Sequence, residues 1–245
     1  MNKVPIALQL WSLHADCRMD FAATVRHVAK LGYHGVELAG YGNLDVHGAV
    51  KALAQTKLLV SGMHVGLARL QSEPAQVVQE ARLFGAQHIT CPSWPKEAFT
   101  TAAACQMIGA QLNAIGAALR LEGINFSYHN HAPEFAEIEG RRVFDWILDA
   151  AEPRNLGCEL DVYWAQVGGK NPAAFIREQG RRITLIHLKD EKELGLGPVN
   201  FSEVFDAADA VGAVHWYIVE QEKYTHQPLE SVRLNFEQLR KWGKA

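Results

Sequence analysis

Short runs of apolar and β-branched residues alternate with longer segments of helical periodicity along the whole chain. Runs of this length predict buried strands, whereas the segments between them repeat apolar residues three and four positions apart, as helices packed by one face do. Successive runs begin roughly thirty residues apart, which suits one strand followed by one helix. The predicted strands cover residues 5–10, 35–39, 58–64, 87–91, 124–129, 156–161, 183–188 and 215–220.

The predicted helices carry recognisable boundary residues. The segment 21–32 stops at Gly32, a residue that readily adopts the left-handed conformation of a helix end. The segment 72–85 places Ser72 at the N-cap and Pro74 inside the first turn. The further helices are 171–180, with Asn171, Pro172 and Gly180 in the same roles, and 228–243.

Eight strand-and-helix units in a chain of 245 residues predict a single-domain (β/α)8 TIM barrel over residues 1–245. A doubly wound open sheet is the alternative. It would usually have fewer strands, and no G-x-G-x-x-G pattern follows the first strand here. The glycines at 195 and 197 lie in a loop after the strand 183–188, with no clear design for binding phosphate.

Composition narrows the class of protein. Twenty-four Lys and Arg against 27 Asp and Glu leave a net charge of −3, which argues against a nucleic-acid binder. The first residues lack the apolar core of a signal peptide, and no run approaches the length of a membrane span. We therefore expect a cytoplasmic protein with reduced, mostly buried thiols and no CxxC pair. The cysteines are Cys17, Cys91, Cys105 and Cys158.

Polar residues lie at the carboxyl ends of the predicted strands, where TIM barrels carry their chemistry. Side chains alternate between the two faces of a strand, so Asp161 shares the inward face with Glu159, and His187 shares it with Lys189. Imidazole and carboxylate groups converging at one rim indicate a divalent-metal site, with Mn²⁺, Zn²⁺, Co²⁺ or Fe²⁺ suited better than Mg²⁺. Other inward positions at this rim hold Gln9, Trp11, Glu37, His64, His129, His131 and Glu220, whereas His88 and His215 begin strands at the opposite rim and are expected to be structural.

Three motifs occur in order on successive strands: YHNHAPEF at 128–135, LDVYW at 160–164 and HLKD at 187–190. Glu220 follows them at the end of the last strand. On these motifs the whole chain resembles the xylose isomerase-like barrel superfamily, which includes sugar epimerases, inosose dehydratases and the endonuclease IV group. The resemblance implies one divalent metal ion, with Mn²⁺ preferred and Zn²⁺, Co²⁺ or Mg²⁺ compatible.

The ligands that the resemblance implies are Glu134, Asp161, His187 and Glu220. Many relatives place an acid at the end of the fifth strand, where this chain has His129. Either Glu134 reaches back from the loop or His129 itself takes the ligand position, and Glu134 is the preferred assignment.

The leading hypothesis is a metal-dependent isomerase or epimerase of a sugar or keto-sugar. A carboxylate would remove the proton next to the substrate carbonyl, giving a metal-stabilised enediolate to which the proton returns. Glu134 and Glu220 are the expected acid/base pair, and His131 and Lys189 are expected to hold the developing oxyanion. Expected substrate contacts are His64, His129, Glu37, Trp11 and Trp164.

Other functions share the same residues. A lyase, such as a dehydratase of a keto-inositol or an enzyme that cleaves a 3-keto-glycoside, would begin with the same proton abstraction, and the pair His129 and His131 favours it. A DNA repair nuclease would need several metals and a cationic face. A non-catalytic sugar-binding module would not need the set Asp161, His187 and Glu220. The expected partner is a small, non-phosphorylated sugar, with no nucleic acid and no membrane, and the resemblance is compatible with a homo-oligomer.

Overall fold

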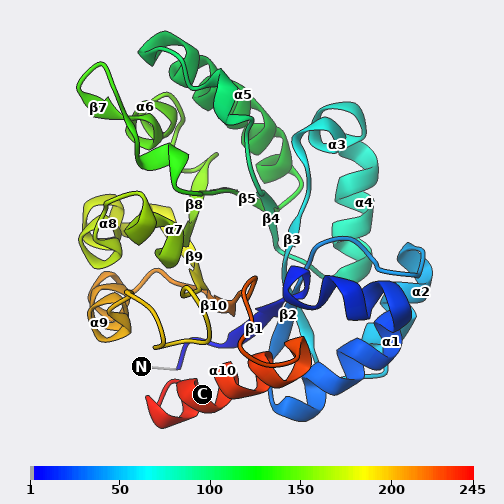
Figure 1. Cartoon of the computed structure of the whole chain (residues 1–245). Helices are drawn as coiled ribbons and strands as arrows, with labels where there is room; N and C mark the ends of the chain where they lie inside the picture. The colour runs from blue at the N-terminus through cyan, green and yellow to red at the C-terminus, as the bar shows by residue number, and fades with distance from the viewer. Residues whose placement is uncertain (1–2) are drawn as a thin grey trace.

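The computed structural model describes residues 3–245 as a closed barrel of parallel strands wrapped by helices (Figure 1). Its strands lie in the order β1-β2-β3-β4-β5-β8-β9-β10, and β10 pairs with β1 to close the ring. The predicted (β/α)8 TIM barrel is therefore confirmed, because the doubly wound alternative would leave two open edges. The prediction that residues 1–245 form one domain stays a prediction. The barrel strands are β1 (Ile6–Gln9), β2 (Gly35–Leu38), β3 (Leu59–His64), β4 (His88–Cys91), β5 (Asn125–His129), β8 (Gly157–Asp161), β9 (Ile183–Leu188) and β10 (Trp216–Val219).

Each barrel strand lies inside its predicted range, and most residues on both faces of the strands are buried. The outward faces pack under the helices, while Ala7, Leu185 and Ile218 form a small separate apolar cluster with Trp216. Leu185 shares its face of β9 with His187, so this cluster lies inside the barrel. Strands buried on both faces appear in the sequence as continuous apolar runs, and such runs are detectable without an alignment.

Helices cover the outside of the barrel, and a small hairpin of β6 (Glu137–Ile138) and β7 (Arg141–Arg142) follows β5 (Figure 1). The hairpin was not predicted, since its strands are too short to show a pattern. The helices are α1 (His14–Leu31), α2 (Val46–Ala54), α3 (Leu67–Ser72), α4 (Pro74–Phe84), α5 (Ala102–Leu121), α6 (Val143–Asp149), α7 (Val162–Val167), α8 (Pro172–Gln179), α9 (Phe201–Val211) and α10 (Pro228–Lys241), with short 3-10 turns η1 (Leu10–Leu13), η2 (Lys96–Ala98), η3 (Pro133–Phe135) and η4 (Gly180–Arg182).

The start and end of α1 agree with the sequence signals. Asp20 leaves the helical conformation (φ −158°, ψ 91°), so the regular helix restarts at Phe21, the predicted beginning. The Asp20 carboxylate accepts a hydrogen bond from the amide of Ala23 at 2.8 Å and caps this second part. Gly32 ends the helix with φ 104°, as its position predicted.

Ser72 corrects the prediction for the next helix. It belongs to the end of α3, where its hydroxyl donates to the carbonyl of Ala68 at 2.8 Å, and so it is not the N-cap of α4. Glu73 occupies that position and makes no side-chain cap, while Pro74 opens α4 as predicted. A serine hydroxyl that bonds back to the preceding turn cannot also cap the following helix.

The cysteines and the longest helix complete the picture of the outer layer. All four cysteines are buried and free, as expected. Among residues 3–245, α5 alone is long and apolar enough to cross a membrane by length and composition. In the structure Cys105, Ile108 and Leu112 of α5 are buried in the core, and the helix packs against α6 and β5.

Candidate functional site

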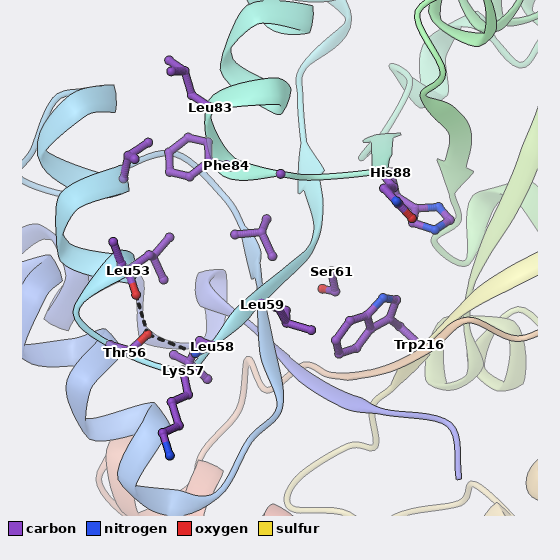
Figure 2. Close-up of a pocket in the computed structure, with 15 residues that line it drawn as sticks. Leu53, Thr56, Lys57, Leu58, Leu59, Ser61, Leu83, Phe84, His88 and Trp216 are labelled. Carbon is purple, nitrogen blue, oxygen red and sulfur yellow. Dashed lines mark hydrogen bonds between the residues drawn. The ribbon is translucent and has the colours of Figure 1, made fainter. Parts of the chain in front are cut away.

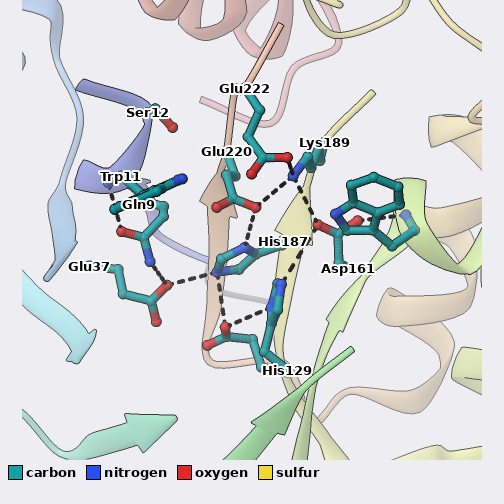
Figure 3. Close-up of polar contacts among 12 residues, drawn as sticks. Gln9, Trp11, Ser12, Glu37, His129, Asp161, His187, Lys189, Glu220 and Glu222 are labelled. Carbon is teal, nitrogen blue, oxygen red and sulfur yellow. Dashed lines mark hydrogen bonds and ion pairs between the residues drawn. The ribbon is translucent and has the colours of Figure 1, made fainter. Parts of the chain in front are cut away.

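Inward-facing imidazoles and carboxylates from six strands meet at the carboxyl end of the barrel (Figure 3). Strand register places neighbouring side chains beside one another, because His129 pairs with Glu159 across β5 and β8, and Asp161 pairs with His187 across β8 and β9. The participants are Glu37 of β2, His64 of β3, His129 of β5, Glu159 and Asp161 of β8, His187 of β9, and Glu220 just after β10.

An upper cluster of four buried side chains has the composition of a metal site. One donor atom each from His129, Asp161, His187 and Glu220 lies within 4.8 Å of all the others. The Glu220 Oε2 lies 3.3 Å from His187 Nδ1, and Asp161 Oδ2 lies 4.0 Å from His129 Nε2. Two nitrogen and two oxygen donors are a set that Mn²⁺, Zn²⁺ or Co²⁺ accepts.

Asp161 supplies the observation that fits a cation best. Its Oδ1 accepts a hydrogen bond from the Trp164 amide at 2.8 Å and caps α7. Its Oδ2 is buried and accepts no hydrogen bond from any residue between 3 and 245. Burial, with the nearby Glu220 charge, raises the pKa of Asp161 to about 7 even though Lys189 opposes the shift. A buried carboxylate oxygen without a donor is costly, and a bound cation would satisfy it.

The imidazoles of this region are electrostatically distinct. Burial and the neighbouring His187 charge lower the pKa of His129 to about 3, so His129 is neutral and has a lone pair for a cation. Burial opposes the charge of His64, but Glu37 and Glu159 outweigh it and raise the pKa of His64 to about 10. The same two carboxylates raise the pKa of His187 well above its ordinary value.

Two further carboxylates, those of Glu37 and Glu159, form a lower layer beneath the cluster. Glu159 Oε1 is 2.6 Å from His64 Nε2, 3.0 Å from His187 Nε2 and 3.1 Å from His129 Nδ1. Glu37 Oε2 is 2.7 Å from His187 Nε2 and 3.2 Å from His64 Nε2. Glu37, an expected substrate contact, is fully buried beside these imidazoles, and its contact with substrate stays a prediction.

Lys189 lies next to the cluster, and three carboxylates balance its positive charge. Its Nζ is 3.1 Å from Glu220 Oε2 and 3.9 Å from Asp161 Oδ2, and it also pairs with Glu222. It sits 5.1 Å from the ring centre of Trp164, close enough for a cation–π contact. Burial opposes the charge of Lys189, yet the surrounding carboxylates raise its pKa.

Glu134 lies outside the upper cluster. It is buried in η3, where its carboxylate accepts hydrogen bonds from the Tyr128 hydroxyl at 2.7 Å and from the His131 amide at 2.9 Å. Burial raises the pKa of Glu134. The member of the YHNHAPEF motif that joins Asp161 in the cluster is His129, the position left open by the sequence.

A pocket of about 450 Å³ opens above these groups and is bordered by residues that were expected to touch substrate. Trp11, 48% exposed and stacked on His14, forms one side. His131 contacts the Trp164 ring at a centroid distance of 5.8 Å. The residues that line the pocket are Trp11, Ala39, His64, Pro92, Ser93, His129, His131, Glu220 and Glu222.

A second cavity, of about 560 Å³, lies at the opposite end of the barrel between β3, α2 and α4 (Figure 2). Leu53, Leu59, Phe84 and Trp216 line it, together with His88. His88 Nε2 lies 3.2 Å from His215 Nδ1, in keeping with the structural role expected for both. Within residues 3–245, a second group besides the upper cluster has the spacing of metal ligands, and it consists of His64, His129, Glu159 and His187. Neither group lies at this end of the barrel.

Sequence reasoning gave no functional role to three residues that the structure brings to the site. Glu159 lies two residues before Asp161, and Glu222 lies two residues after Glu220. Because side chains two positions apart on a strand share a face, this alternation was the available signal that both point inward. Gln9 donates to Glu37 Oε2 at 2.7 Å and was known only as an inward polar residue of the first strand. Their roles depend on distances between strands, which parity does not supply.

Comparison with known proteins agrees with this architecture. A profile of the xylose isomerase-like TIM barrel family matches residues 25–242. An inosose dehydratase of Geobacillus thermodenitrificans is 24% identical over an alignment of 136 residues. The alignment covers 46% of this chain and 45% of that protein, so the match spans less than half of the relative. A sugar phosphate isomerase/epimerase from Parabacteroides distasonis has a TM-score of 0.87 and 25% identity, covering 98% of each chain. A 3-keto-D-glucoside 4-epimerase from E. coli has a TM-score of 0.72 and 14% identity, covering 98% of this chain and 100% of that one.

Proposed function

Because the chain belongs to the xylose isomerase-like TIM barrel family, we propose that it is a divalent-metal-dependent isomerase or epimerase of a sugar or keto-sugar. The unpartnered Asp161 Oδ2, within a cluster of two imidazoles and two carboxylates, is the observation that carries this proposal. The structural neighbours named as isomerases and epimerases support the reaction class.

His129, Asp161, His187 and Glu220 would hold the ion, in place of the set with Glu134. Glu134 already accepts two hydrogen bonds, so its position favours a role in shaping the loop that carries His131. Mn²⁺ is the proposed ion, as the family resemblance implies, and the mixed nitrogen and oxygen set is also compatible with Zn²⁺, Co²⁺ or Mg²⁺. When bound, the ion would polarise the substrate carbonyl and its neighbouring hydroxyl.

The chain's own residues would then bind the sugar and move one proton. Glu220 borders the pocket, and Lys189 and His187 hold its pKa well below the usual range against the effect of burial, so it is a carboxylate able to accept the proton next to the carbonyl. His131 and Lys189 would donate hydrogen bonds to the developing oxyanion. Trp11 would stack on the apolar face of the sugar ring.

A lyase with the same first step is the second candidate. The inosose dehydratase relative favours it, as does the pair His129 and His131 on one strand end. In a lyase, the group on the carbon beyond the proton leaves instead of the proton returning. Only the product distinguishes the two reactions.

Metal content of the purified protein is the first test. We expect about one divalent ion per chain, lost in the double variant Asp161→Ala, His187→Ala and in His129→Ala, and kept in Glu134→Gln. Retention by His129→Ala with loss in Glu134→Gln would restore the assignment of Glu134. A wild-type protein that stays metal-free after incubation with Mn²⁺, Zn²⁺ and Co²⁺ would overturn the proposed function.

The reaction is then tested in D₂O with keto-sugars, 3-keto-glycosides and a keto-inositol. Deuterium in an isomeric product supports the isomerase or epimerase. A dehydrated or cleaved product instead identifies the lyase.

A further inference from the structure

The two histidines of the proposed metal cluster each turn one nitrogen towards the cluster and the other towards a buried carboxylate (Figure 3). His129 directs Nε2 towards Asp161 and has Nδ1 3.1 Å from Glu159 Oε1. His187 directs Nδ1 towards Glu220 and has Nε2 2.7 Å from Glu37 Oε2 and 3.0 Å from Glu159 Oε1. Both Glu37 and Glu159 are fully buried.

We infer that Glu37 and Glu159 are positioning residues that set the tautomer and orientation of the two histidine ligands. An imidazole binds a cation only through a nitrogen without a proton, so its other nitrogen must carry the proton and find an acceptor. Glu159 provides this acceptor for His129 Nδ1–H, and Glu37 with Glu159 provides it for His187 Nε2–H. The inference rests on the proposed metal site and assigns to this chain the residues that support it.

The carboxylates are themselves held in place. Gln9 Nε2 donates to Glu37 Oε2 at 2.7 Å, and Thr90 Oγ1 donates to Glu159 Oε2 at 3.0 Å. His64 Nε2 lies between the two carboxylates and balances their charge, at 2.6 Å from Glu159 and 3.2 Å from Glu37. Glu37 Oε2 and both oxygens of Glu159 therefore have partners, whereas Glu37 Oε1 accepts no hydrogen bond from any residue between 3 and 245.

The backbone of two strands also fits Glu37 to its position. The pairing of β2 with β3 shifts register between Val36 and Glu37, a local irregularity of the kind that redirects a side chain. A Cβ on Gly62 of β3 would lie 3.0 Å from Glu37 Oε1. A larger residue at this position would therefore push against the Glu37 carboxylate.

The spacing in this layer favours hydrogen bonds over a second cation. Donor atoms around a tetrahedral ion with bonds of about 2.0 Å are roughly 3.3 Å apart. The separations of 2.6 Å between His64 and Glu159 and 2.7 Å between His187 and Glu37 are shorter. They are the lengths of charge-assisted hydrogen bonds between an imidazole and a carboxylate.

The experiment measures Mn²⁺ affinity and stoichiometry by titration calorimetry for the wild type, Glu37→Gln and Glu159→Gln. We expect one site in all three, with affinity reduced about 10- to 100-fold in each variant. Glu193→Gln is the matched control, because Glu193 is also a buried, hydrogen-bonded carboxylate but accepts from Thr225 and from Ser231 of α10 and belongs to neither potential metal-ligand group. Its metal affinity should equal that of the wild type.

A spectroscopic readout separates positioning from general loss of structure. In the Zn²⁺-loaded wild type, ¹⁵N–¹H correlation of the imidazoles should show Nδ1–H on His129 and Nε2–H on His187. In the glutamine variants these signals should shift or broaden, while the far-UV circular dichroism stays that of the wild type. If a glutamine variant does not fold, Thr90→Val and Gly62→Ala provide the test, because each changes a residue that contacts one of the two carboxylates. Both substitutions should also weaken metal binding.

Three results would overturn the inference. One metal bound with unchanged affinity in both glutamine variants would remove only the positioning role and leave the proposed function intact. Two ions in the wild type, with the second lost in Glu37→Gln, would make the carboxylates ligands. A wild type that binds no ion would remove both the inference and the proposed function.

Discussion

Glu134 is a buried carboxylate whose environment makes it a structural anchor for the loop after β5. The Tyr128 hydroxyl comes from inside β5 and the His131 amide from its end, so the two hydrogen bonds bend the chain back over the strand. The His131 side chain is thereby directed into the pocket beside Trp164. Hydrogen bonds to charged acceptors contribute more than neutral ones, roughly 1.5–3 kcal/mol against about 1 kcal/mol.

Tyr128→Phe should therefore lower the free energy of unfolding by about 2 kcal/mol, because it leaves a buried carboxylate with one donor fewer. Tyr33→Phe is the matched control, since Tyr33 is also buried but donates to a neutral acceptor, the Val232 carbonyl, at 2.7 Å. Urea denaturation of both variants measures the difference. A loss in Tyr128→Phe no larger than in Tyr33→Phe would show that the carboxylate is not an anchor.

Helix α5 packs on the barrel through glycines in place of side chains. A Cβ on Gly116 would lie 1.8 Å from the Asn155 carbonyl oxygen, and one on Gly109 would lie 2.2 Å from the Ile147 carbonyl oxygen. The helix backbone therefore approaches the chain just before β8 and the last turn of α6. Because β8 carries Glu159 and Asp161, this contact supports the strand on which the site depends most.

The substitution Gly116→Ala in α5 has two opposing effects on stability, one from helix propensity and one from packing. Helix propensity alone would make alanine more stable by about 1 kcal/mol. The backbone contact predicts the opposite, a loss of about 1–3 kcal/mol from overpacking. Thermal and urea unfolding give the sign, with exposed Ala118→Gly as a control for propensity. A more stable Gly116→Ala protein would mean that the packing contact is unimportant.

Across the whole molecule, the barrel interior has two different ends. The carboxyl end holds the charged cluster, and the amino end holds the His88–His215 pair, with Ala7, Leu185 and Ile218 forming an apolar cluster inside the barrel. Burial lowers the pKa of His88 to about 4, and the neighbouring His215 adds to the shift. The folded state therefore favours the neutral form of His88.

The free energy of unfolding should therefore decrease as the pH is lowered. Between pH 6.5 and pH 4 the unfolded chain protonates residue 88 while the folded chain does not, so protons favour unfolding. From pH 7 to pH 5 the contribution is a loss of about 2 kcal/mol. The loss attributable to His88 should disappear in His88→Asn, as measured by urea unfolding at both pH values. Equal pH dependence in the two proteins would show that His88 does not carry the effect.

The spacing of apolar runs was sufficient to predict the barrel, and each strand end was correct to within a residue or two, because strands that are largely buried on both faces consist mainly of apolar residues. Parity was sufficient to predict that Asp161, His187 and Glu220 point inward to one rim. These properties are local to a strand, and the sequence contains them in full. The resemblance of the three motifs added the family and the expectation of a metal ion.

The tertiary structure decided the position of each site side chain along the barrel axis. Parity does not say how far Glu134 reaches, and its two local hydrogen bonds hold it away from the cluster that His129 joins. Nor does parity say that Glu37 and Glu159 lie beneath the histidines, since this depends on the register shift in β2 and on barrel closure. Faces belong to single strands, whereas distances across a barrel arise only when all of its strands pair.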